Sequence, residues 1–345
     1  MVGIDISDRS IKVAEVSEGQ SQHIVSVCWS SLPPGALQRG IVQNAPLIIE
    51  AITQAFQKCS PVPVKKRSVI ASIPEVRSFV RVLELPAMAE EELDEAIKWA
   101  VRQHIPFDLE RMYIDWEPVG EPDLSGRRQV LVGAAQRDVV NPLLEVLEAA
   151  GLRVTALELE AQAIVRSLLP LDRRGVQGVL IVDLGATTTN IIYVNAGSLR
   201  FSTSIEVGGD TLTWQLAGSL HLQPAVADEK KAEIGLRQQQ DQDVATALRI
   251  ATLELARKVE KVVREVGTQE GSQQAVREIL LAGGAANLPG IIEIFAEIFP
   301  GIPIQMGNPW TNLVREEEKS FQMSPQDASH FATALGLALR QDVST

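Results

Sequence analysis

The sequence predicts an α/β protein built from two similar domains that face each other, and three observations lead to this prediction. Residues 2–13 and 180–191 share one pattern: an apolar strand that ends in Asp, a tight turn of small and hydroxyl residues, and a second strand. Asp5 in the first segment corresponds to Asp183 in the second, a separation that indicates duplicated domains rather than a short-period array. A third turn, Gly283-Gly284, lies between an expected strand and an expected helix.

These three turns indicate the kind of ligand. Each Asp-ended turn leaves backbone N–H groups unpaired, and such groups suit phosphate oxygens. The carboxylate of Asp5 or Asp183 can hold Mg²⁺ through water. Two such turns in opposite domains, with a glycine-rich loop beside a helix N-terminus, predict an ATP site between the domains. The glycines match neither the Rossmann nor the Walker A pattern.

The first core begins with the hairpin of residues 2–13. A third strand is expected at His23–Leu32, where Pro33-Pro34-Gly35 ends it. Pro46 opens a helix whose apolar residues recur at helical spacing. A further strand at Ser68–Ile73 completes this part of the core.

The pattern changes at Glu84-Leu85-Pro86. A charged helix follows from about Glu90 to Gln103, then strands at Met112–Val119 and Gln129–Gln136, then a helix at Val139–Ala150. Because this segment carries its own strands and helices between two pieces of core, we expect an inserted α+β subdomain.

The chain then returns to the first core and passes to the second. A strand at Val154–Leu159 and a helix at Ala161–Leu169 precede a hinge at Arg173-Arg174-Gly175. After the second hairpin, a strand at Ser198–Ile205 leads to Gly208-Gly209-Asp210, which begins a helix.

The rest of the chain is mostly helical in pattern. Residues 211–266 are nearly all helical, and the polar run 237–243 is expected to be a solvated loop between helices. A strand is expected at Glu278–Ala282, a helix opened by Leu288-Pro289-Gly290, and a final helix at Ala328–Arg340.

The expected domain boundaries follow from this order of elements. They are residues 1–83, 150–174 and 328–345 for the first core, 84–149 for the inserted subdomain, 175–210 and 268–327 for the second core, and 211–267 for a helical subdomain of the second domain.

Composition excludes several classes of protein. The chain has 345 residues and a formal net charge of −12, whereas nucleic-acid binders need Lys and Arg to displace counterions. No apolar run is long enough to span a bilayer, so we expect a cytosolic protein. Cys28 and Cys59 form no Cys-x-x-Cys pair, and we expect structural thiols. None of the four histidines lies at metal-ligand spacing from another.

Each candidate residue has an alternative role. Asp5 or Asp183, taken alone, is equally well explained as a turn cap; as a repeated pair they favour a metal site. Lys12 is expected beside the first turn, within reach of a phosphate, or else as an exposed strand lysine. Gly283-Gly284 alone more often reflects tight packing.

Two further carboxylates are candidates for catalysis. Glu158 and Glu160 lie at the end of an expected strand in the first core. A carboxylate there can orient an attacking water, or it can cap the following helix.

Several motifs along the chain have a family resemblance. They are Gly3-Ile4-Asp5-Ile6-Ser7 with Ser10-Ile11-Lys12, Leu32-Pro33-Pro34-Gly35, Gln103-His104-Ile105-Pro106-Phe107 followed by Ile114-Asp115-Trp116-Glu117, Asp183-Leu184-Gly185-Ala186-Thr187-Thr188-Thr189-Asn190, and Gly208-Gly209. In these motifs the sequence resembles the actin-like ATPase superfamily and, within it, the PilM family of type IV pilus assembly proteins, to which the cell-division protein FtsA is related.

This resemblance runs from residue 2 to about Arg340. It implies an actin-like (ribonuclease H-like) two-domain ATPase fold with Mg-ATP in the interdomain cleft. The residues that it assigns to ATP and Mg²⁺ are Asp5, Ser7, Ser10, Ile11 and Lys12 in the first phosphate loop, Asp183, Gly185, Ala186, Thr187 and Thr188 in the second, Gly208 near it, Gly283, Gly284 and Asn287 in the adenosine loop, and Asp228 and Lys231 near ribose and base; Asp5 and Asp183 are the metal candidates.

The resemblance also implies a partner. Members of the family bind the cytoplasmic N-terminal tail of a PilN-type bitopic membrane protein, as an extended peptide in a groove beside the inserted subdomain. Ile105, Pro106 and Phe107 are candidates for the groove wall, and a role in buttressing the subdomain is an equal alternative. The implied function is an ATP-binding cytoplasmic scaffold of the inner-membrane assembly platform. Unlike FtsA, the chain shows no amphipathic membrane tail, so membrane attachment is expected to be indirect.

Two departures from actin bear on catalysis. Ala186 stands where actin has a metal-ordering carboxylate, and no Gln is evident that would position a water. We therefore expect ATP binding with weak or no hydrolysis. A small-molecule kinase of the same superfamily is the alternative function, and an actin-like filament former is a third possibility.

Overall fold

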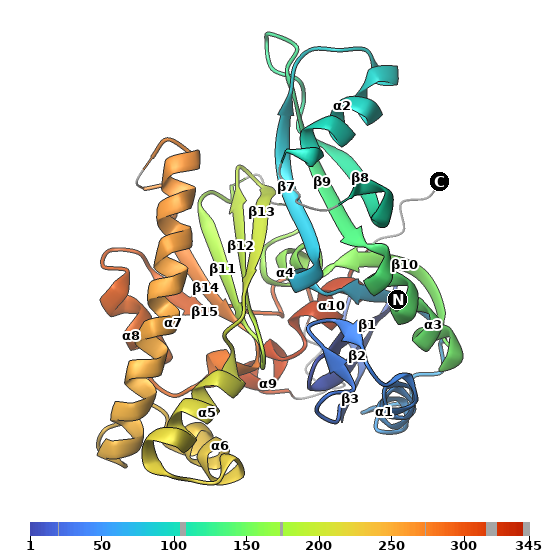
Figure 1. Ribbon diagram of the computed structural model, residues 1–345. Helices are drawn as coiled ribbons and strands as arrows, with labels where there is room; N and C mark the ends of the chain where they lie inside the picture. Colours follow the sequence, from blue (N-terminus) through green and yellow to red (C-terminus); the bar gives the residue numbers. More distant parts are fainter. Residues whose placement is uncertain (20, 104–107, 173–174, 273, 315–322, 341–345) are drawn as a thin grey trace.

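Two β-sheets with helices on their faces form the molecule in the computed structural model (Figure 1). The structure describes residues 1–19, 21–103, 108–172, 175–272, 274–314 and 323–340. A five-stranded sheet lies in the first core and an eight-stranded sheet begins in the second. The α/β class predicted from the sequence is confirmed.

The first sheet is built around the first hairpin. Its strands, in spatial order, are β10 (Arg153–Leu159), β6 (Ser68–Ile73), β1 (Val2–Ser7), β2 (Ser10–Val16) and β3 (Ile24–Ser31). Strand β1 is antiparallel to β2 and parallel to β6. A small ribbon of β4 (Leu37–Gln38) and β5 (Ile41–Val42) follows β3.

Helices cover both faces of the first sheet. Helix α1 (Ala45–Gln57) begins after Asn44, whose side chain accepts a hydrogen bond from the N–H of Leu47, with Pro46 in the first turn as expected. It packs on β3, and α3 (Arg137–Ala149) packs beside it. On the other face, α10 (Ala332–Ala338) contacts β1, β2 and α4 (Glu160–Leu168).

The contact between α10 and α4 is unusually close because it is made through a glycine. A Cβ atom added to Gly336 would lie 1.8 Å from the carbonyl oxygen of Ala163. A Cβ on Gly3 would lie 2.2 Å from the carbonyl oxygen of Ala334. Both glycines let backbones approach to a distance that no larger residue permits.

The second sheet repeats the arrangement of the first. Its strands, in spatial order, are β15 (Ile304–Met306), β14 (Glu278–Ala282), β11 (Val179–Leu184), β12 (Thr189–Asn195), β13 (Ser198–Ile205), β7 (Ser78–Leu85), β9 (Arg128–Gln136) and β8 (Met112–Val119). Strand β11 is antiparallel to β12 and parallel to β14, as β1 is to β2 and β6. The duplication predicted from the two Asp-ended hairpins is thus present in the topology.

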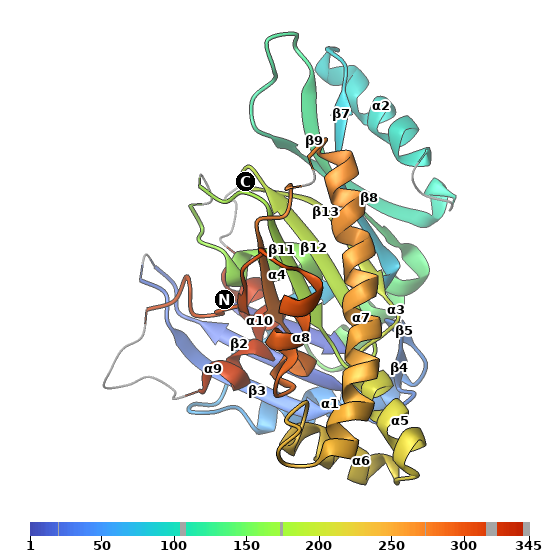
Figure 2. The same cartoon turned by 90° about the vertical axis from the view of Figure 1, so that its left-hand side faces the viewer.

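The alternation along β11 divides its side chains between two cores. Leu180, Val182 and Leu184 pack against the helical side, which includes α7 (Gln242–Gln269) and α8 (Ile291–Ile298). Val179 and Ile181 pack toward α4, between the sheets. Figure 2 shows α7 running along the sheet, with α5 (Gly209–Leu220) and α6 (Pro224–Glu233) at its lower end.

The expected inserted subdomain contributes strands to this second sheet. Strand β7 was not predicted; it pairs along its length with β9, and through Val80 and Arg81 with β13. Strand β8 pairs on the far side of β9, and α2 (Glu90–Arg102) packs on β7 (Figure 1). The short 3₁₀ turns η1 (Glu75–Arg77) and η2 (Leu109–Arg111) lead into β7 and β8. The domain boundaries given above remain a prediction.

Two features of the helical regions bear on the sequence predictions. Residues 237–241 of the polar run do lie between helices, because α6 ends at Glu233, whereas Gln242 and Asp243 already form the start of α7. The single final helix expected at 328–340 is instead two helices, α9 (Pro325–Ser329) and α10, separated at His330 and Phe331. No helix in the described ranges has both the length and the hydropathy that crossing a bilayer requires.

The expectation of two free thiols is wrong. Cys28 on β3 and Cys59 after α1 form a disulfide. The chain that leaves α1 returns beside β3, where Val27 and Ser60 exchange backbone hydrogen bonds of 2.9 and 3.0 Å. This return sets the two sulfur atoms together, and the spacing of the cysteines in the sequence does not reveal it.

Candidate functional site

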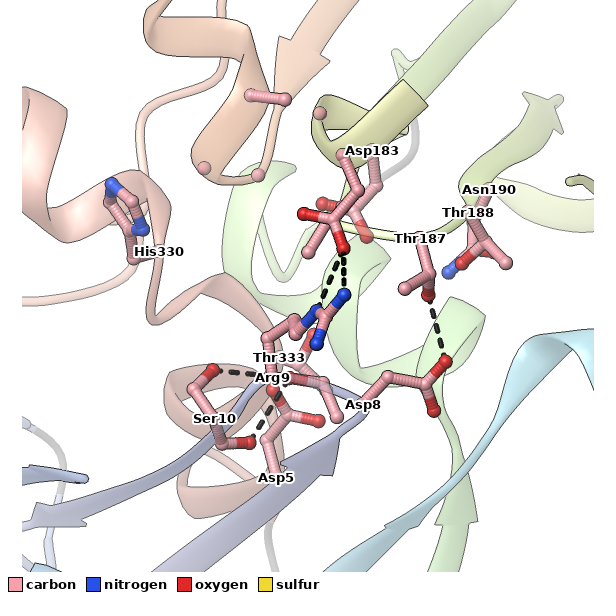
Figure 3. A pocket seen from close by; sticks show the side chains of 18 of the residues that line it. Asp5, Asp8, Arg9, Ser10, Asp183, Thr187, Thr188, Asn190, His330 and Thr333 are labelled. Atoms are coloured by element: carbon pink, nitrogen blue, oxygen red, sulfur yellow. Dashed lines mark hydrogen bonds and ion pairs between the residues drawn. The ribbon is translucent and has the colours of Figure 1, made fainter. Parts of the chain in front are cut away.

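A cavity of about 610 Å³ lies where the two duplicated hairpins face each other. Its wall includes the β1–β2 turn, the β11–β12 turn, the first residues of α5 and the loop η3 (Gly284–Asn287). Residues of α6 and of the α9–α10 junction close the remaining sides. Figure 3 shows side chains from both turns pointing into the same space.

The first turn presents hydroxyl groups and an ion pair. The Ser7 and Ser10 hydroxyl oxygens lie 3.1 Å apart. Asp5 is buried, and its carboxylate accepts a hydrogen bond of 3.1 Å from the Ser72 hydroxyl. The Lys12 ammonium lies 3.3 Å from the other Asp5 oxygen, since Asp5 and Lys12 are cross-strand neighbours. The charge of Asp5 is therefore compensated within the first core.

The second turn is longer and presents a less compensated carboxylate. The N–H of Gly185 donates to the carbonyl of Thr188 at 2.9 Å, and the N–H of Gly209 donates to the carbonyl of Gly185 at 3.0 Å. Burial raises the pKa of Asp183 to about 6, although Lys12 and a hydrogen bond with Asn190 act in the opposite direction.

Asp183 is approached closely by the third turn. Gly283 has φ +81°, and a Cβ atom there would lie 2.6 Å from an Asp183 carboxylate oxygen. A glycine is required at this position both for its backbone conformation and for the space that it leaves.

The carboxylates of the cavity fit a magnesium ion that is bound through water, rather than a metal site in which protein side chains supply most of the ligands. Within the described residues, no group of three or more His, Cys, Asp or Glu side chains is arranged to hold a metal. Mg²⁺ keeps several waters and is usually bound by one or two carboxylates together with ligand phosphates. Asp183, buried and incompletely compensated, suits that role.

Most of the residues expected from the resemblance line this cavity. They are Asp5, Ser7, Ser10, Lys12, Asp183, Gly185, Ala186, Thr187, Thr188, Asp228, Lys231, Gly283, Gly284 and Asn287.

The other expected residues do not line it. Ile11 is fully buried in the first core, because alternation along β2 points it away from the face that carries Lys12. Gly208 lies just behind the wall, where a Cβ atom would be 2.5 Å from the Ala186 carbonyl oxygen. Ile105, Pro106 and Phe107 lie outside the described residues.

Asp228 and Lys231 are held together on one turn of α6. The Lys231 ammonium lies 2.7 Å from Asp228 and donates to the Thr213 hydroxyl at 2.6 Å and the Gly209 carbonyl at 3.2 Å. Burial would raise the pKa of Asp228, but the hydrogen bond and charge of Lys231 hold it below its usual value.

Glu158 and Glu160 have different environments. Glu158 is buried in an ion pair with Arg166 at 2.5 Å and does not line the cavity. Glu160 does line it, and its carboxylate accepts from the Asn190 side chain at 3.0 Å and from the backbone N–H of Glu75 at 3.2 Å.

Several lining residues were not predicted. They include Asp8, Arg9, Arg39, Glu75, Asn190, Asp210, Ser329, His330 and Thr333, together with neighbouring apolar residues. One signal was available for Glu75 and Asp210: the first follows a buried strand, as Asp183 ends one, and the second follows the Gly208-Gly209 pair.

Glu75 and Glu160 form a buried acidic pair beneath the second turn. Burial raises the pKa of Glu75 to about 7, against hydrogen bonds from Ser202 and the Ala161 backbone. Burial, followed by the charges of Asp5 and Glu75, raises the pKa of Glu160 as well. One Glu75 oxygen is buried without a hydrogen-bond partner in the described structure.

The replacement Glu75→Gln is expected to remove part of the pH dependence of stability. Glu75 binds its proton more tightly in the folded chain, so its contribution is fully present below about pH 4.5 and is lost as pH rises through about 7. A shift of this size corresponds to about 3 kcal/mol at pH 8. Gln keeps an oxygen to accept from Ser202, so the variant should be more stable than the wild type at pH 8 and nearly equal at pH 4.5.

Urea unfolding at both pH values measures this difference. Glu145→Gln, on the exposed face of α3, is the matched control and should follow the wild type. Glu160 and Asp183 titrate in the same direction, so a smaller slope remains in the variant. An unchanged difference between pH 4.5 and pH 8 in Glu75→Gln would contradict this assignment.

Comparison with known proteins gives both a family and a fold. The family model described as type IV pilus assembly protein PilM matches residues 3–342. Among curated proteins, cell division protein FtsA of Enterococcus faecalis is 24% identical, covering 96% of this chain and 85% of that protein. Ethanolamine utilization protein EutJ of Escherichia coli is 30% identical over 163 residues, which is 47% of this chain and 51% of EutJ.

Solved structures share the fold. A PilM-PilN type IV pilus biogenesis complex contains a chain with a TM-score of 0.82 and 24% identity, covering 98% of this chain and 97% of that one. MreB5 of Spiroplasma citri bound to AMPPNP has a TM-score of 0.54 and 13% identity, covering 97% and 93%. The fold is therefore the actin-like ATPase fold, and because the family model spans nearly all of the sequence, this chain belongs to the PilM family of type IV pilus assembly proteins.

Proposed function

We propose that this chain binds Mg-ATP in the cavity and acts as a scaffold in pilus assembly, holding the cytoplasmic N-terminal tail of a PilN-type membrane protein. The proposed nucleotide binding is supported chiefly by one observation: the Asp-ended turns of the two duplicated hairpins face each other across one cavity. The solved MreB5 with AMPPNP is a protein of the same fold with a nucleotide analogue bound.

In this proposal each wall of the cavity binds a different part of Mg-ATP. The turn amides and the hydroxyls of Ser7, Ser10, Thr187 and Thr188 bind phosphate oxygens. Asp183, with Asp5, holds Mg²⁺ through water, and the ion neutralises phosphate charge. The Gly283–Asn287 loop receives the adenosine, with Lys231 beside the ribose.

We propose that turnover is weak or absent. Ala186 provides no carboxylate beside the metal, and of the two candidate carboxylates Glu158 and Glu160 the second lines the cavity. One of its oxygens already accepts hydrogen bonds from the Asn190 side chain and from the backbone N–H of Glu75, so that oxygen is engaged within the protein. The chain would then act through ATP binding rather than ATP hydrolysis, as expected for a scaffold.

The partner part of the proposal is supported by family membership and by the solved PilM-PilN complex. The PilN-type tail would bind as an extended peptide beside the inserted subdomain. Attachment through that partner would place the chain on the cytoplasmic side of the inner membrane. The groove wall at residues 105–107 stays a prediction.

A peptide titration tests this function. A fluorescently labelled PilN-type N-terminal peptide, added to the full chain, is expected to bind saturably, and a scrambled peptide of the same composition is not. Mg-ATP is expected to change the peptide affinity by about fivefold or more, as an allosteric coupling of 1 kcal/mol requires. Failure of the natural peptide to saturate, with or without Mg-ATP, would exclude the proposed partner.

A further inference from the structure

One ion pair crosses the cavity from the tip of the first turn to the second core. Arg9 donates from Nε to Asp210 at 2.7 Å, and its Nη2 lies 2.6 Å from the same carboxylate oxygen. Both side chains line the cavity (Figure 3 shows Arg9 extended from the first turn). Asp210 belongs to the first turn of α5.

The charges around the cavity make this pair important for an anionic ligand. Among the described lining residues, seven are Asp or Glu and four are Lys or Arg. The other three cations are also paired: Lys12 with Asp5, Lys231 with Asp228, and Arg39 with Glu206. A polyphosphate therefore meets cations whose charge is already neutralised, unless a carboxylate gives one up or a metal ion enters with it.

Arg9 can be released at a lower cost than Lys12, and unlike the more exposed Arg39 it is paired with a carboxylate that itself lines the cavity. The Lys12–Asp5 pair is largely buried, with side-chain exposures of 14% and 6%, whereas Arg9 and Asp210 retain 36% and 31%. Exposed pairs contribute little to stability, because water and salt screen them. Asp210 without Arg9 would still be stabilised by the N-terminal dipole of α5.

The backbone of Arg9 is held where the two turns meet. Its neighbour Asp8 accepts from the Thr187 hydroxyl at 2.9 Å (Figure 3). Asp8 also accepts from the N–H of Arg39 at 3.0 Å. Because Asp8 fixes the turn, the guanidinium group of Arg9 can change partner without moving the strand. A guanidinium fork binds phosphate oxygens in the same bidentate manner as it binds carboxylates.

We propose that Arg9 is a phosphate-binding residue. Without ligand, its guanidinium group is paired with the Asp210 carboxylate; when the ligand binds, the polyphosphate replaces that carboxylate as the partner of Arg9. This inference rests on the proposed ATP binding and adds a specific anion exchange to it. Asp210 acts as a competitor for Arg9, so the two members of one ion pair have opposite effects on ligand affinity.

Calorimetric titration of Mg-ATP and of magnesium tripolyphosphate into four proteins tests the exchange. Arg9→Gln is expected to weaken both ligands by about tenfold, as for the loss of a charged hydrogen bond. Asp210→Asn is expected to tighten both by about threefold. In the double variant, Asp210→Asn should give no gain over Arg9→Gln, because no guanidinium remains to be released.

The outcomes separate this inference from the proposed function. A gain from Asp210→Asn that persists in the Arg9→Gln background would show simple charge repulsion and overturn the exchange. Equal affinities for wild type and Arg9→Gln would overturn it as well, while leaving ATP binding intact. A wild-type chain that binds neither ligand would refute ATP binding itself and the exchange with it.

Discussion

Replacing Gly336 with Ala is expected to destabilise the chain more than any other single methyl group added to it. The new Cβ would lie 1.8 Å from the carbonyl oxygen of Ala163 and 2.4 Å from its carbonyl carbon. Neither atom belongs to a flexible side chain, so α10 and α4 must move apart. Because α10 also packs on β1 and β2, the shift would reach the strand that carries Asp5. We expect a loss of about 4 kcal/mol or more.

The matched control is Gly218→Ala on α5. Gly218 is also a helical glycine, but a Cβ atom there would meet nothing within 4 Å. Ala favours the helix, so this variant should be more stable by about 0.5–1 kcal/mol. Thermal unfolding compares the two: a fall of roughly 6 °C or more is expected for Gly336→Ala. Equal melting temperatures for both variants would show that α10 does not pack on α4 as described.

Replacing Asp183 with Asn is expected to abolish the contribution of magnesium to nucleotide binding. Asn has nearly the shape of Asp, and burial disfavours the charge that it removes, so the folded chain should be as stable as the wild type or more so. The affinity for Mg-ATP should nevertheless fall roughly 100-fold, because the carboxylate that orders the hydrated ion is lost.

The dependence on metal distinguishes this effect from general damage to the site. In excess EDTA the variant should bind ATP at least as well as the wild type, because one negative charge has left an acidic cavity. Asp243→Ala, an exposed carboxylate in the first turn of α7, is the control and should leave Mg-ATP affinity unchanged. A Mg-ATP affinity in Asp183→Asn within twofold of the wild type would remove Asp183 from the metal site.

The fold was predictable from the sequence where local patterns decide the structure. Strands β6 and β8 occupy the expected ranges, and the two Asp-ended hairpins have the same neighbours in their sheets. Strand β7 was missed because its partners, β9 and β13, are distant in the sequence and only their pairing defines it. The disulfide was missed for the same reason, since it depends on the return of the chain beside β3.

The residues of the candidate site also fall into two groups, those that local sequence predicts and those whose roles depend on contacts between distant segments. The residues of the turns and loops were predictable, since the backbone of a tight turn requires particular residue types at fixed spacing. Arg9 and Asp210 each stand beside an expected site residue, yet their partnership is formed only when the two domains meet. The sequence shows only that Glu75 follows a buried strand, and its role as a buried acid depends on Ser202 and Glu160 from distant segments.

Hydrogen–deuterium exchange of the wild-type chain, with and without Mg-ATP, tests most directly whether both turns bind one nucleotide. The account predicts slower exchange at residues 5–12, 183–190 and 283–287 together, with the same dependence on Mg-ATP concentration. Amides of α2, in the inserted subdomain and away from the cavity, serve as an internal reference for overall stabilisation. Slower exchange in one turn alone would contradict a single site between the duplicated hairpins. Protection of the two turns at different Mg-ATP concentrations would contradict it as well.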